Sequence, residues 1–343
     1  MRSGVLSIGT ITVDYAKKID HLPELEALVI IDEVSSSTGG PGLNIAFDIK
    51  QLDPQLRIEA IGCLSQDANG QFIIDQSSKI GLINDRMQPS INPLSGFTDA
   101  MTLKSNGKRT FLFHIGSNND LDFDVIDVDL HKPKILHLGA PGVHSKMDKV
   151  DANGESGWVR VLKRAKSLGI HTNLEMIHLD AESEKALVLP CLPYLSSIII
   201  NESEAGALVD LPFKVDGADS DVDWITMELI ASKLITLGVS QLAVIHTPAG
   251  CVAADSTGKT WRQGSVKVPL SQIKGTSGAG DAFAAGVVYG IHQAWPVQDC
   301  LELGVATAAQ NIQSDKTAAD IAQYETTLSQ SRSLGYRNTS KQV

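Results

Sequence analysis

Residues 275–286 read GTSGAGDAFAAG: six small residues, three of them glycines, precede one aspartate and an apolar run. The continuation, DAFAAGVVYGIHQAW, is apolar on all sides and long enough for a buried helix. Small residues let backbone N–H groups converge, and at a helix start those amides and the helix dipole form an anion site. The stretch therefore predicts that Gly278, Ala279 and Gly280 cradle an anion while Asp281 accepts a proton beside it.

This combination suits transfer of a phosphoryl group to a hydroxyl. Such catalysis is mostly positioning and charge neutralisation, with one carboxylate that orients the attacking oxygen and takes its proton. General-base help of this kind is worth about 10²–10⁴ in rate. An acidic residue near a helix start is also common for a purely structural reason, because it stabilises the helix by about 0.3–1 kcal/mol. Taken alone, Asp281 leaves both interpretations open.

Other glycine-rich motifs fit this loop poorly. The pattern GxGxxG fails after Gly280, and GxxxxGK[ST] occurs nowhere in the chain. A hydrolase elbow, GxSxG, nearly fits around Ser277, but its fifth residue is Ala279 and only His292 lies beyond it to complete a triad. A serine hydrolase therefore stays as a rival hypothesis.

The composition is that of an ordinary globular protein, with 343 residues, 43% hydrophobic content and a net charge of -11. This charge disfavours nucleic-acid and anionic-membrane partners, because both require clustered Lys and Arg. The four cysteines form no CxxC pair or Cys/His metal spacing. No window reaches the roughly 18 apolar residues of a membrane span, and no cleavable leader pattern opens the chain. We therefore expect a cytoplasmic protein.

Short apolar runs alternate with helix-length segments, which predicts a mainly parallel sheet covered on both faces. The fold class is thus α/β. The expected strands are 5–8, 58–61, 135–138, 170–174, 197–200 and 242–245, and the expected helices are 43–52, 70–80, 158–168 and 225–237.

Two segments, 15–37 and 96–116, depart from this alternation of strands and helices, because apolar and polar residues alternate along them. The second carries a hairpin-like Ser-Asn-Gly-Lys turn at 105–108. We expect both segments to form a small antiparallel sheet attached to the α/β body. That sheet is interpreted as a lid, with a dimer contact or an edge decoration as alternatives.

The rest of the chain contains polar stretches but no clean linker. Residues 144–157 and 210–223 are expected to be surface loops. The prediction is one domain, 1–328, that includes the lid, followed by a frayed tail, 329–343.

Oxygen-bearing side chains follow the expected strand 197–200. Asn201 comes directly after it, and Glu202 and Glu204 lie just beyond. The carboxyl ends of parallel strands are where α/β proteins bind ligands, and Mg²⁺ takes a few oxygen ligands together with water and phosphates. Asn201 and Glu204 are therefore candidate magnesium ligands. The same residues also fit a simple helix start, with Asn201 as N-cap and acids in the first turn.

A second glycine cluster, STGGPGLNIAF, occupies residues 37–47. Gly39 and Gly40 allow a ligand close to the backbone, and Asn44 can donate and accept hydrogen bonds, as a sugar hydroxyl requires. Upstream, Asp14 ends the first strand-like segment and offers an acceptor for two adjacent hydroxyls. A tight turn and a strand-end aspartate would explain these residues without a ligand.

These segments, in this order, resemble the ribokinase-like, PfkB-type carbohydrate kinase family. The resemblance spans roughly residues 4–320. The matching features are the strand that ends in Asp14, the Gly-Gly segment with Asn44, GCLSQDANGQF at 62–72, N-x-x-E at 201–204 and the C-terminal GAGDAF.

The resemblance implies a three-layer α/β sandwich with a β lid, and ATP with Mg²⁺ as the phosphoryl-donor system. Asp281 would be the base, and residues 278–280 would form the anion hole. The residues that the resemblance implies at the Mg²⁺–phosphate site are Asn201 and Glu204, and those at the sugar are Asp14, Gly40 and Asn44.

The chain departs from this family in the last glycine loop, which in relatives often begins Asp-Thr-Thr and here begins at Gly275, preceded by Lys274. A later loop that commonly contains Gly-Ala reads SDKTA at 314–318. In relatives these two loops enclose a monovalent cation. The changes put activation by K⁺ in doubt and make Lys274 and Lys316 candidates to replace the ion.

The nucleotide segment departs as well. After the expected strand 242–245 relatives usually show G-x-x-G, and here the residues run from Thr247 to Gly250 as TPAG. Gly250 matches the last glycine of that pattern and is a candidate contact to the nucleotide. We expect Thr247 to contact the nucleotide through its hydroxyl or backbone. ATP remains the expected donor.

The sequence thus predicts an ATP-dependent kinase that phosphorylates a hydroxyl, expected to be the primary one, of a small sugar. The alternative acceptors are a nucleoside or a 2-keto-3-deoxy sugar acid, whose carboxylate would meet Arg109 on the expected lid. A catalytically silent sugar- or nucleotide-binding protein of the same fold is the alternative outside the enzyme class. A homodimer through the lid is a further expectation.

Overall fold

The structure is a computed structural model that describes residues 2–105, 109–314 and 320–339. Two features predicted from the sequence, the tip of the hairpin turn at 106–108 and most of the loop at 314–318, lie outside these residues. Within the described part of the chain, no helix is both long and apolar enough to cross a membrane.

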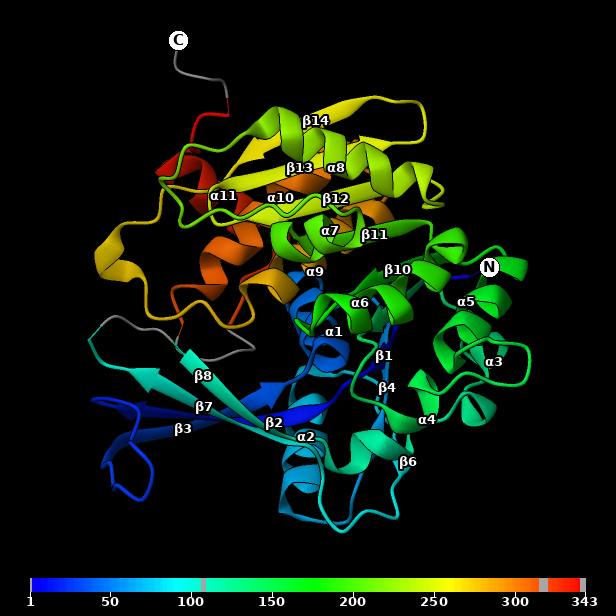
Figure 1. Ribbon diagram of the computed structural model, residues 1–343, viewed down its shortest axis with the longest axis vertical. Helices are drawn as coiled ribbons and strands as arrows, with labels where there is room; N and C mark the ends of the chain where they lie inside the picture. Colours follow the sequence, from blue (N-terminus) through cyan, green and yellow to red (C-terminus); the bar gives the residue numbers. More distant parts are fainter. Residues whose placement is uncertain (1, 106–108, 315–319, 340–343) are drawn as a thin grey trace.

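An eight-stranded sheet forms the centre of the molecule, in the order β14-β13-β12-β11-β10-β9-β1-β4 (Figure 1). The strands from β12 to β4 are parallel, while β13 and β14 pair antiparallel at one edge. All the strands expected from the sequence are confirmed at nearly the same bounds. They are β1 (Val5–Gly9), β4 (Ile58–Ile61), β9 (Ile135–Gly139), β10 (His171–Glu175), β11 (Ser197–Asn201) and β12 (Leu242–Thr247), joined by β13 (Gly250–Asp255) and β14 (Thr260–Gly264).

Helices cover both faces of this sheet, as the continuous apolar strands require. Alternate residues of β1 serve the two sides: Leu6 and Ile8 belong to one hydrophobic core and Val5 to the other. The core that contains Val5 packs α1 (Pro41–Leu52), α2 (Ala68–Ile80), α9 (Ala279–His292), α10 (Val297–Asn311) and α11 (Tyr324–Leu334). The other packs α3 (Val128–His131), α4 (Ser145–Asp148), α5 (Gly157–Ser167), α6 (Ala181–Val188), α7 (Glu202–Leu208) and α8 (Trp224–Thr236).

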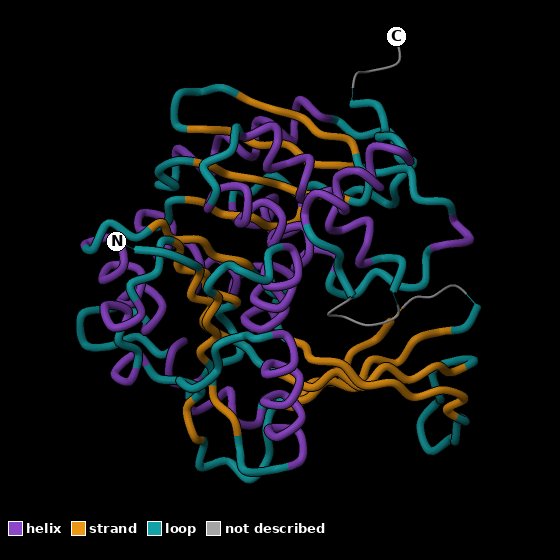
Figure 2. Tube along the Cα trace, turned by 180° about the vertical axis from the view of Figure 1, so that it is seen from behind, coloured by secondary structure: helices purple, strands orange, loops and turns teal. Residues whose placement is uncertain are grey.

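The two segments expected to form a lid build a separate four-stranded sheet that projects from the body (Figures 1 and 2). Two antiparallel hairpins make it, and their first strands pair with each other in parallel. The parallel pair arises because both hairpins leave the body in the same direction. The strands are β2 (Thr12–Ile19), β3 (Ile31–Gly39), β7 (Phe97–Leu103) and β8 (Arg109–His114); a short pair, β5 (Cys63–Leu64) and β6 (Gln88–Pro89), lies outside both sheets.

The C-terminal region corrects one expectation. Residues 329–334 do not fray but continue α11, and beyond it Tyr336 bridges to Val266. The N–H of Arg337 donates to the carbonyl of Ser265 at 2.8 Å. The tail is held because Leu334 and Tyr336 pack against the core that also contains α9 and α10.

The stretch 144–157 is also not simply a surface loop. It contains α4, and both His144 and Met147 are fully buried. Asp148 anchors the segment, because its carboxylate accepts hydrogen bonds from the backbone N–H of Gly142 and from the indole of Trp158.

Candidate active site

A cavity of about 480 Å³ lies where the parallel strands β1, β9, β10, β11 and β12 end, with lid strands β7 and β8 along one side. This is the position at which α/β sheets bind ligands. The lid contributes Phe111 and Phe113 to its wall. The sequence-predicted residues that line the cavity are Asp14, Gly40, Asn44, Asn201, Glu204, Gly278, Gly280 and Asp281.

The glycine loop opens a helix at the cavity, as expected. Gly278 is the N-cap residue of α9, with a left-handed φ of 75°, and α9 begins at Ala279. The first helical bond runs from the N–H of Ala282 to the carbonyl of Gly278 at 2.8 Å. No described side chain caps this end, and Gly278 and Gly280 line the cavity, so the positive end of the α9 dipole lies at the cavity wall.

Asp281 is held by a residue from a distant part of the sequence. The Nδ2 of Asn44, in the first turns of α1, donates to Oδ2 of Asp281 at 2.5 Å. Asn44 is almost completely buried and Asp281 is half-buried, so this hydrogen bond is partly shielded from solvent. The contact orients the Asp281 carboxylate through Oδ2, and a side-chain hydrogen bond also links Asp281 to Glu175.

Two further acids lie close to Asp281, and the sequence analysis did not identify either. Asp48 follows Asn44 by one helical turn and is fully buried; Glu175 ends β10 and lines the cavity. Burial, and secondly the negative charge of Asp281, raise the pKa of both carboxyl groups well above their ordinary values. The neutral acid form is therefore favoured at both positions. An aspartate four residues after Asn44 in an apolar helical segment was the available signal for Asp48.

The lid hairpin places Asp14 beside the first glycine cluster. Thr12 and Gly39 are paired across β2 and β3, and the hydroxyl of Thr12 donates to Oδ1 of Asp14 at 2.9 Å. A Cβ added to Gly39 would lie 2.3 Å from the carboxyl atoms of Asp14. Gly39 therefore leaves the space that this carboxylate occupies. The adjacent Gly40, with φ 87°, caps α1 and accepts the N–H of Asn44 at 2.9 Å.

Asn201 and Glu204 adopt the helix-start arrangement. Oδ1 of Asn201 accepts the N–H of Glu204 at 2.9 Å, and Oε2 of Glu204 accepts the N–H of Asn201 at 3.0 Å. This capping box opens α7 at the cavity wall. Burial raises the pKa of Glu204 to about 7.

Asn201 and Glu204 offer few ligands for Mg²⁺, but their oxygen atoms are of the type that this ion prefers. Across the described ranges, no group of three or more His, Cys, Asp and Glu side chains is arranged to hold a metal ion. The capping box uses Oε2 of Glu204, a residue that lines the cavity, and does not use its Oε1. Mg²⁺ bound with nucleotide phosphates and water needs only one or two protein carboxylates.

Some predicted residues do not line the cavity. Ala279 and Gly39 lie next to lining residues. The guanidinium of Arg109 lies against the backbone of Gly275, where an added Cβ would be 2.4 Å from its Nη2. Thr247 closes the turn between β12 and β13, because its hydroxyl donates to the carbonyl of Gly250 at 3.1 Å. The ligand roles of these residues stay predictions.

The geometry excludes the serine hydrolase hypothesis. Ser277 lines the cavity at the start of α9, whereas His292 ends that helix, roughly 20 Å away by helical rise. The Nε2 of His292 accepts the N–H of Gly4 at 3.1 Å. The triad that the sequence allowed therefore cannot form.

The fold and the cavity together indicate a class: a sandwich of the ribokinase type with a carboxylate, Asp281, in the first turn of a helix that follows glycines at the cavity wall, as in phosphotransferases that act on hydroxyl groups. The family model of the pfkB family carbohydrate kinases matches residues 2–323. The chain belongs to the pfkB family of carbohydrate kinases.

Individual relatives are distant. The chain is 23% identical over 326 residues to 5-dehydro-2-deoxygluconokinase of Clostridium perfringens, covering 94% of this chain and 90% of the relative. It is 27% identical over 288 residues to a probable chloroplastic fructokinase-6 of Arabidopsis thaliana, covering 79% and 67%. Its structure is similar to Arabidopsis thaliana ribokinase complexed with ribose and ATP, with a TM-score of 0.77, 20% identity and coverage of 96% and 98%.

Proposed function

We propose that this protein transfers the γ-phosphoryl group of ATP to a hydroxyl, expected to be the primary one, of a small sugar. The observation that carries the proposal is the Asp281 carboxylate, held by Asn44 at 2.5 Å at the N-terminus of α9 on the cavity wall. A carboxylate in that place can take a proton from an attacking hydroxyl beside a site for negative charge.

Each group of site residues has its own role in the proposed phosphoryl transfer. Asp14 accepts two sugar hydroxyls, and the turn at Gly39 and Gly40 lets the sugar approach the backbone. The acceptor hydroxyl lies at the carboxylate of Asp281, which receives its proton as the new oxygen–phosphorus bond forms and the bond from the γ-phosphorus to the leaving ADP breaks. The amides of residues 278–280 stabilise the negative charge of the transferring group.

ATP supplies the phosphoryl group, and Mg²⁺ supplies charge neutralisation on its phosphates. Glu204 through Oε1, with Asn201 beside it, would hold the ion directly or through water. Thr247 and Gly250, in the β12–β13 turn, are the proposed contacts to the nucleotide. Gly275 lacks the carboxylate that the resemblance leads one to expect, so the reaction is proposed to run without K⁺.

The lining of the cavity favours an uncharged acceptor. No Lys or Arg is found among the described residues that line it, whereas Asp14, Glu175, Glu204 and Asp281 are. A neutral sugar suits this lining better than a sugar acid, whose carboxylate would meet these acids. Relatives named 5-dehydro-2-deoxygluconokinase, whose name denotes a keto sugar acid, instead support such an acid as the second acceptor to test.

A coupled assay of ADP release tests the proposal. The panel contains pentoses, hexoses, 5-dehydro-2-deoxygluconate, 2-keto-3-deoxy sugar acids and nucleosides. We expect ADP release to depend on one sugar of this panel and on Mg²⁺. Sugar or nucleotide binding without ADP release from any acceptor would refute the kinase proposal and favour the catalytically silent binding protein.

We further propose a cytoplasmic homodimer joined through the lid. Ile31, Val34 and Leu112 expose apolar side chains on the lid sheet, and all four cysteines are buried free thiols, in keeping with a reducing compartment. Light scattering after size exclusion measures the mass; a monomer at high protein concentration would contradict the dimer.

A further inference from the structure

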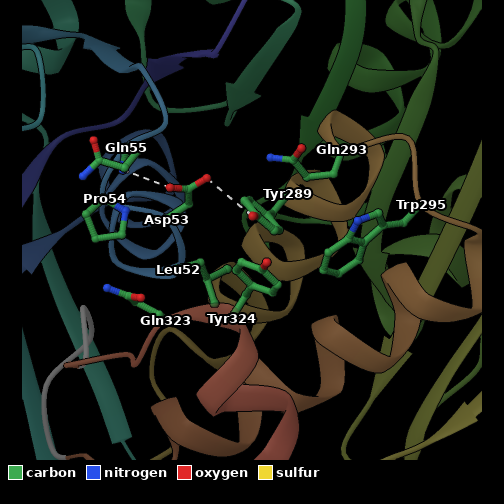
Figure 3. Close-up of a pocket in the computed structure, with 9 residues that line it drawn as sticks. All are labelled: Leu52, Asp53, Pro54, Gln55, Tyr289, Gln293, Trp295, Gln323 and Tyr324. Carbon is green, nitrogen blue, oxygen red and sulfur yellow. Dashed lines mark hydrogen bonds between the residues drawn. The ribbon is translucent and has the colours of Figure 1, made fainter.

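A second pocket, of about 570 Å³, lies at the far ends of the two helices that hold Asn44 and Asp281 (Figure 3). Its walls come from the turn after α1, from the last turn of α9 with the residues that follow, and from the start of α11. From Asn44 to Asp53, the C-cap residue of α1, the helix rises roughly 13 Å. The pocket is therefore separate from the active-site cavity, and no step of the proposed reaction uses it.

Three aromatic rings from different elements meet in this pocket. The ring centroids of Tyr289 and Trp295 are 5.6 Å apart, those of Tyr289 and Tyr324 are 5.3 Å apart, and those of Trp295 and Tyr324 are 5.5 Å apart. Tyr289 is buried, whereas Trp295 and Tyr324 are half-buried and present part of their surface to the pocket. Rings grouped in this way offer electron-rich faces and edges to a ligand.

One carboxylate faces the rings. Asp53 accepts the N–H of Gln55 at 2.9 Å and a long hydrogen bond from the hydroxyl of Tyr289 at 3.5 Å (Figure 3). Among the residues described, no Lys or Arg lies within ion-pair distance of Asp53: the nearby Lys50 donates to the carbonyls of Pro54 and Leu56 and interacts with Asp53 only through its charge. Asp53 is the one charged side chain among the described residues that line the pocket, and burial followed by the charge of Asp53 raises the pKa of Tyr289.

This lining selects the class of ligand. No described Lys or Arg lines the pocket, so phosphates and other anions would find no cationic partner there and would be repelled by Asp53. A neutral ligand would leave the charge of Asp53 unused. A cation gains both from the carboxylate and from the rings, since ammonium groups are attracted to aromatic faces by about 0.5–2 kcal/mol each. The volume lies in the range of small-molecule sites, which have room for an organic body attached to the charge.

We propose that this pocket binds a small organic ammonium ion, with its charged group paired with Asp53 and packed against Tyr324 and Trp295. The amides of Gln55 and Gln293 at the rim supply hydrogen bonds to the rest of the ligand. The proposal does not depend on the kinase reaction and holds or fails by itself.

Calorimetric titration of the full chain tests it, with choline and ethanolammonium as probes. The neutral control is 3,3-dimethyl-1-butanol, which has the shape of choline without its charge, and NaCl keeps the ionic strength constant. We expect saturable binding of a probe, and binding of the neutral control weaker by at least about tenfold. No saturable binding of either probe, or equal affinity for the neutral control, overturns the proposal.

Variants assign any binding to this pocket rather than to the acidic active site. Asp53→Asn keeps the size of the side chain and should weaken the probe by at least about tenfold. Tyr324→Leu, at the half-buried rim, should weaken it severalfold, and Asp75→Asn, an exposed acid on α2, should leave it unchanged. Circular dichroism confirms folding. Folded Asp53→Asn or Tyr324→Leu protein that binds the probe as the wild type does overturns the proposal.

Discussion

Gly39→Ala should weaken sugar binding although residue 39 donates no side-chain group. The added Cβ would lie 2.3 Å from the carboxyl atoms of Asp14, whereas non-bonded carbon atoms need about 3.5 Å, so the carboxylate must move by roughly 1 Å. Such a shift breaks its bond from Thr12 and misplaces its proposed hydrogen bonds to the sugar. Each hydrogen bond to a charged group is worth about 1.5–3 kcal/mol, which corresponds to an increase in KM of about 10–150-fold.

Steady-state kinetics with the best acceptor measure this effect. Because Asp14 binds the sugar in the ground state and in the transition state alike, we expect KM to rise with little change in kcat, and Asp14→Asn to behave in the same way. Gly217→Ala is the matched control, since a Cβ there has nothing within 4 Å. A folded Gly39→Ala variant with the KM of the wild type would refute the assignment of Asp14 to the sugar.

Three further predictions concern the helix start, acid stability and the monovalent cation. Asn44→Leu removes the 2.5 Å bond to Asp281 and should lower kcat by about 10–150-fold; unchanged kcat would show that the orientation of Asp281 does not need it. Burial lowers the pKa of His246 from 6.5 to about 4. As the pH falls from 6.5 to about 4, this imidazole therefore binds a proton in the unfolded chain before it does so in the folded protein, and the folded protein loses stability. In urea unfolding from pH 7 to pH 4, His246→Leu should therefore lose stability less steeply than the wild type, by up to about 1.4 kcal/mol per pH unit, and parallel curves would contradict this. Initial rates in K⁺ and in Na⁺ should be equal, because Gly275 carries no carboxylate for the ion; stimulation by K⁺ would show that other groups bind it.

The elements that the sequence predicted are those whose causes are local. A strand buried on both faces must be apolar throughout, so the run at 242–245 marked β12 without any knowledge of its neighbours. The start of α9 could be predicted for the same reason, since glycines before an apolar helix act on the backbone next to them. Neither inference required a long-range contact.

What the sequence did not predict depends on packing between distant segments. The pKa of Asp48 is raised only because α9 packs on α1 and buries this carboxyl group near Asp281. The position of Arg109 could not be predicted, because the docking of the lid places its guanidinium against Gly275; its role toward a ligand stays a prediction. The tail could not be predicted either, since α11 and Tyr336 are held by contacts with residues many positions earlier in the chain.

The most direct test of the central claim is the activity of Asp281→Asn. The substitution keeps the shape of the side chain but removes the proton acceptor at the N-terminus of α9. The proposal predicts that kcat for ADP release falls by about 10²–10⁴ or more, while the Kd for ATP, measured by calorimetry, stays within a few-fold of the wild type. Turnover close to that of the wild type in a folded Asp281→Asn protein would contradict the assignment of Asp281 as the base.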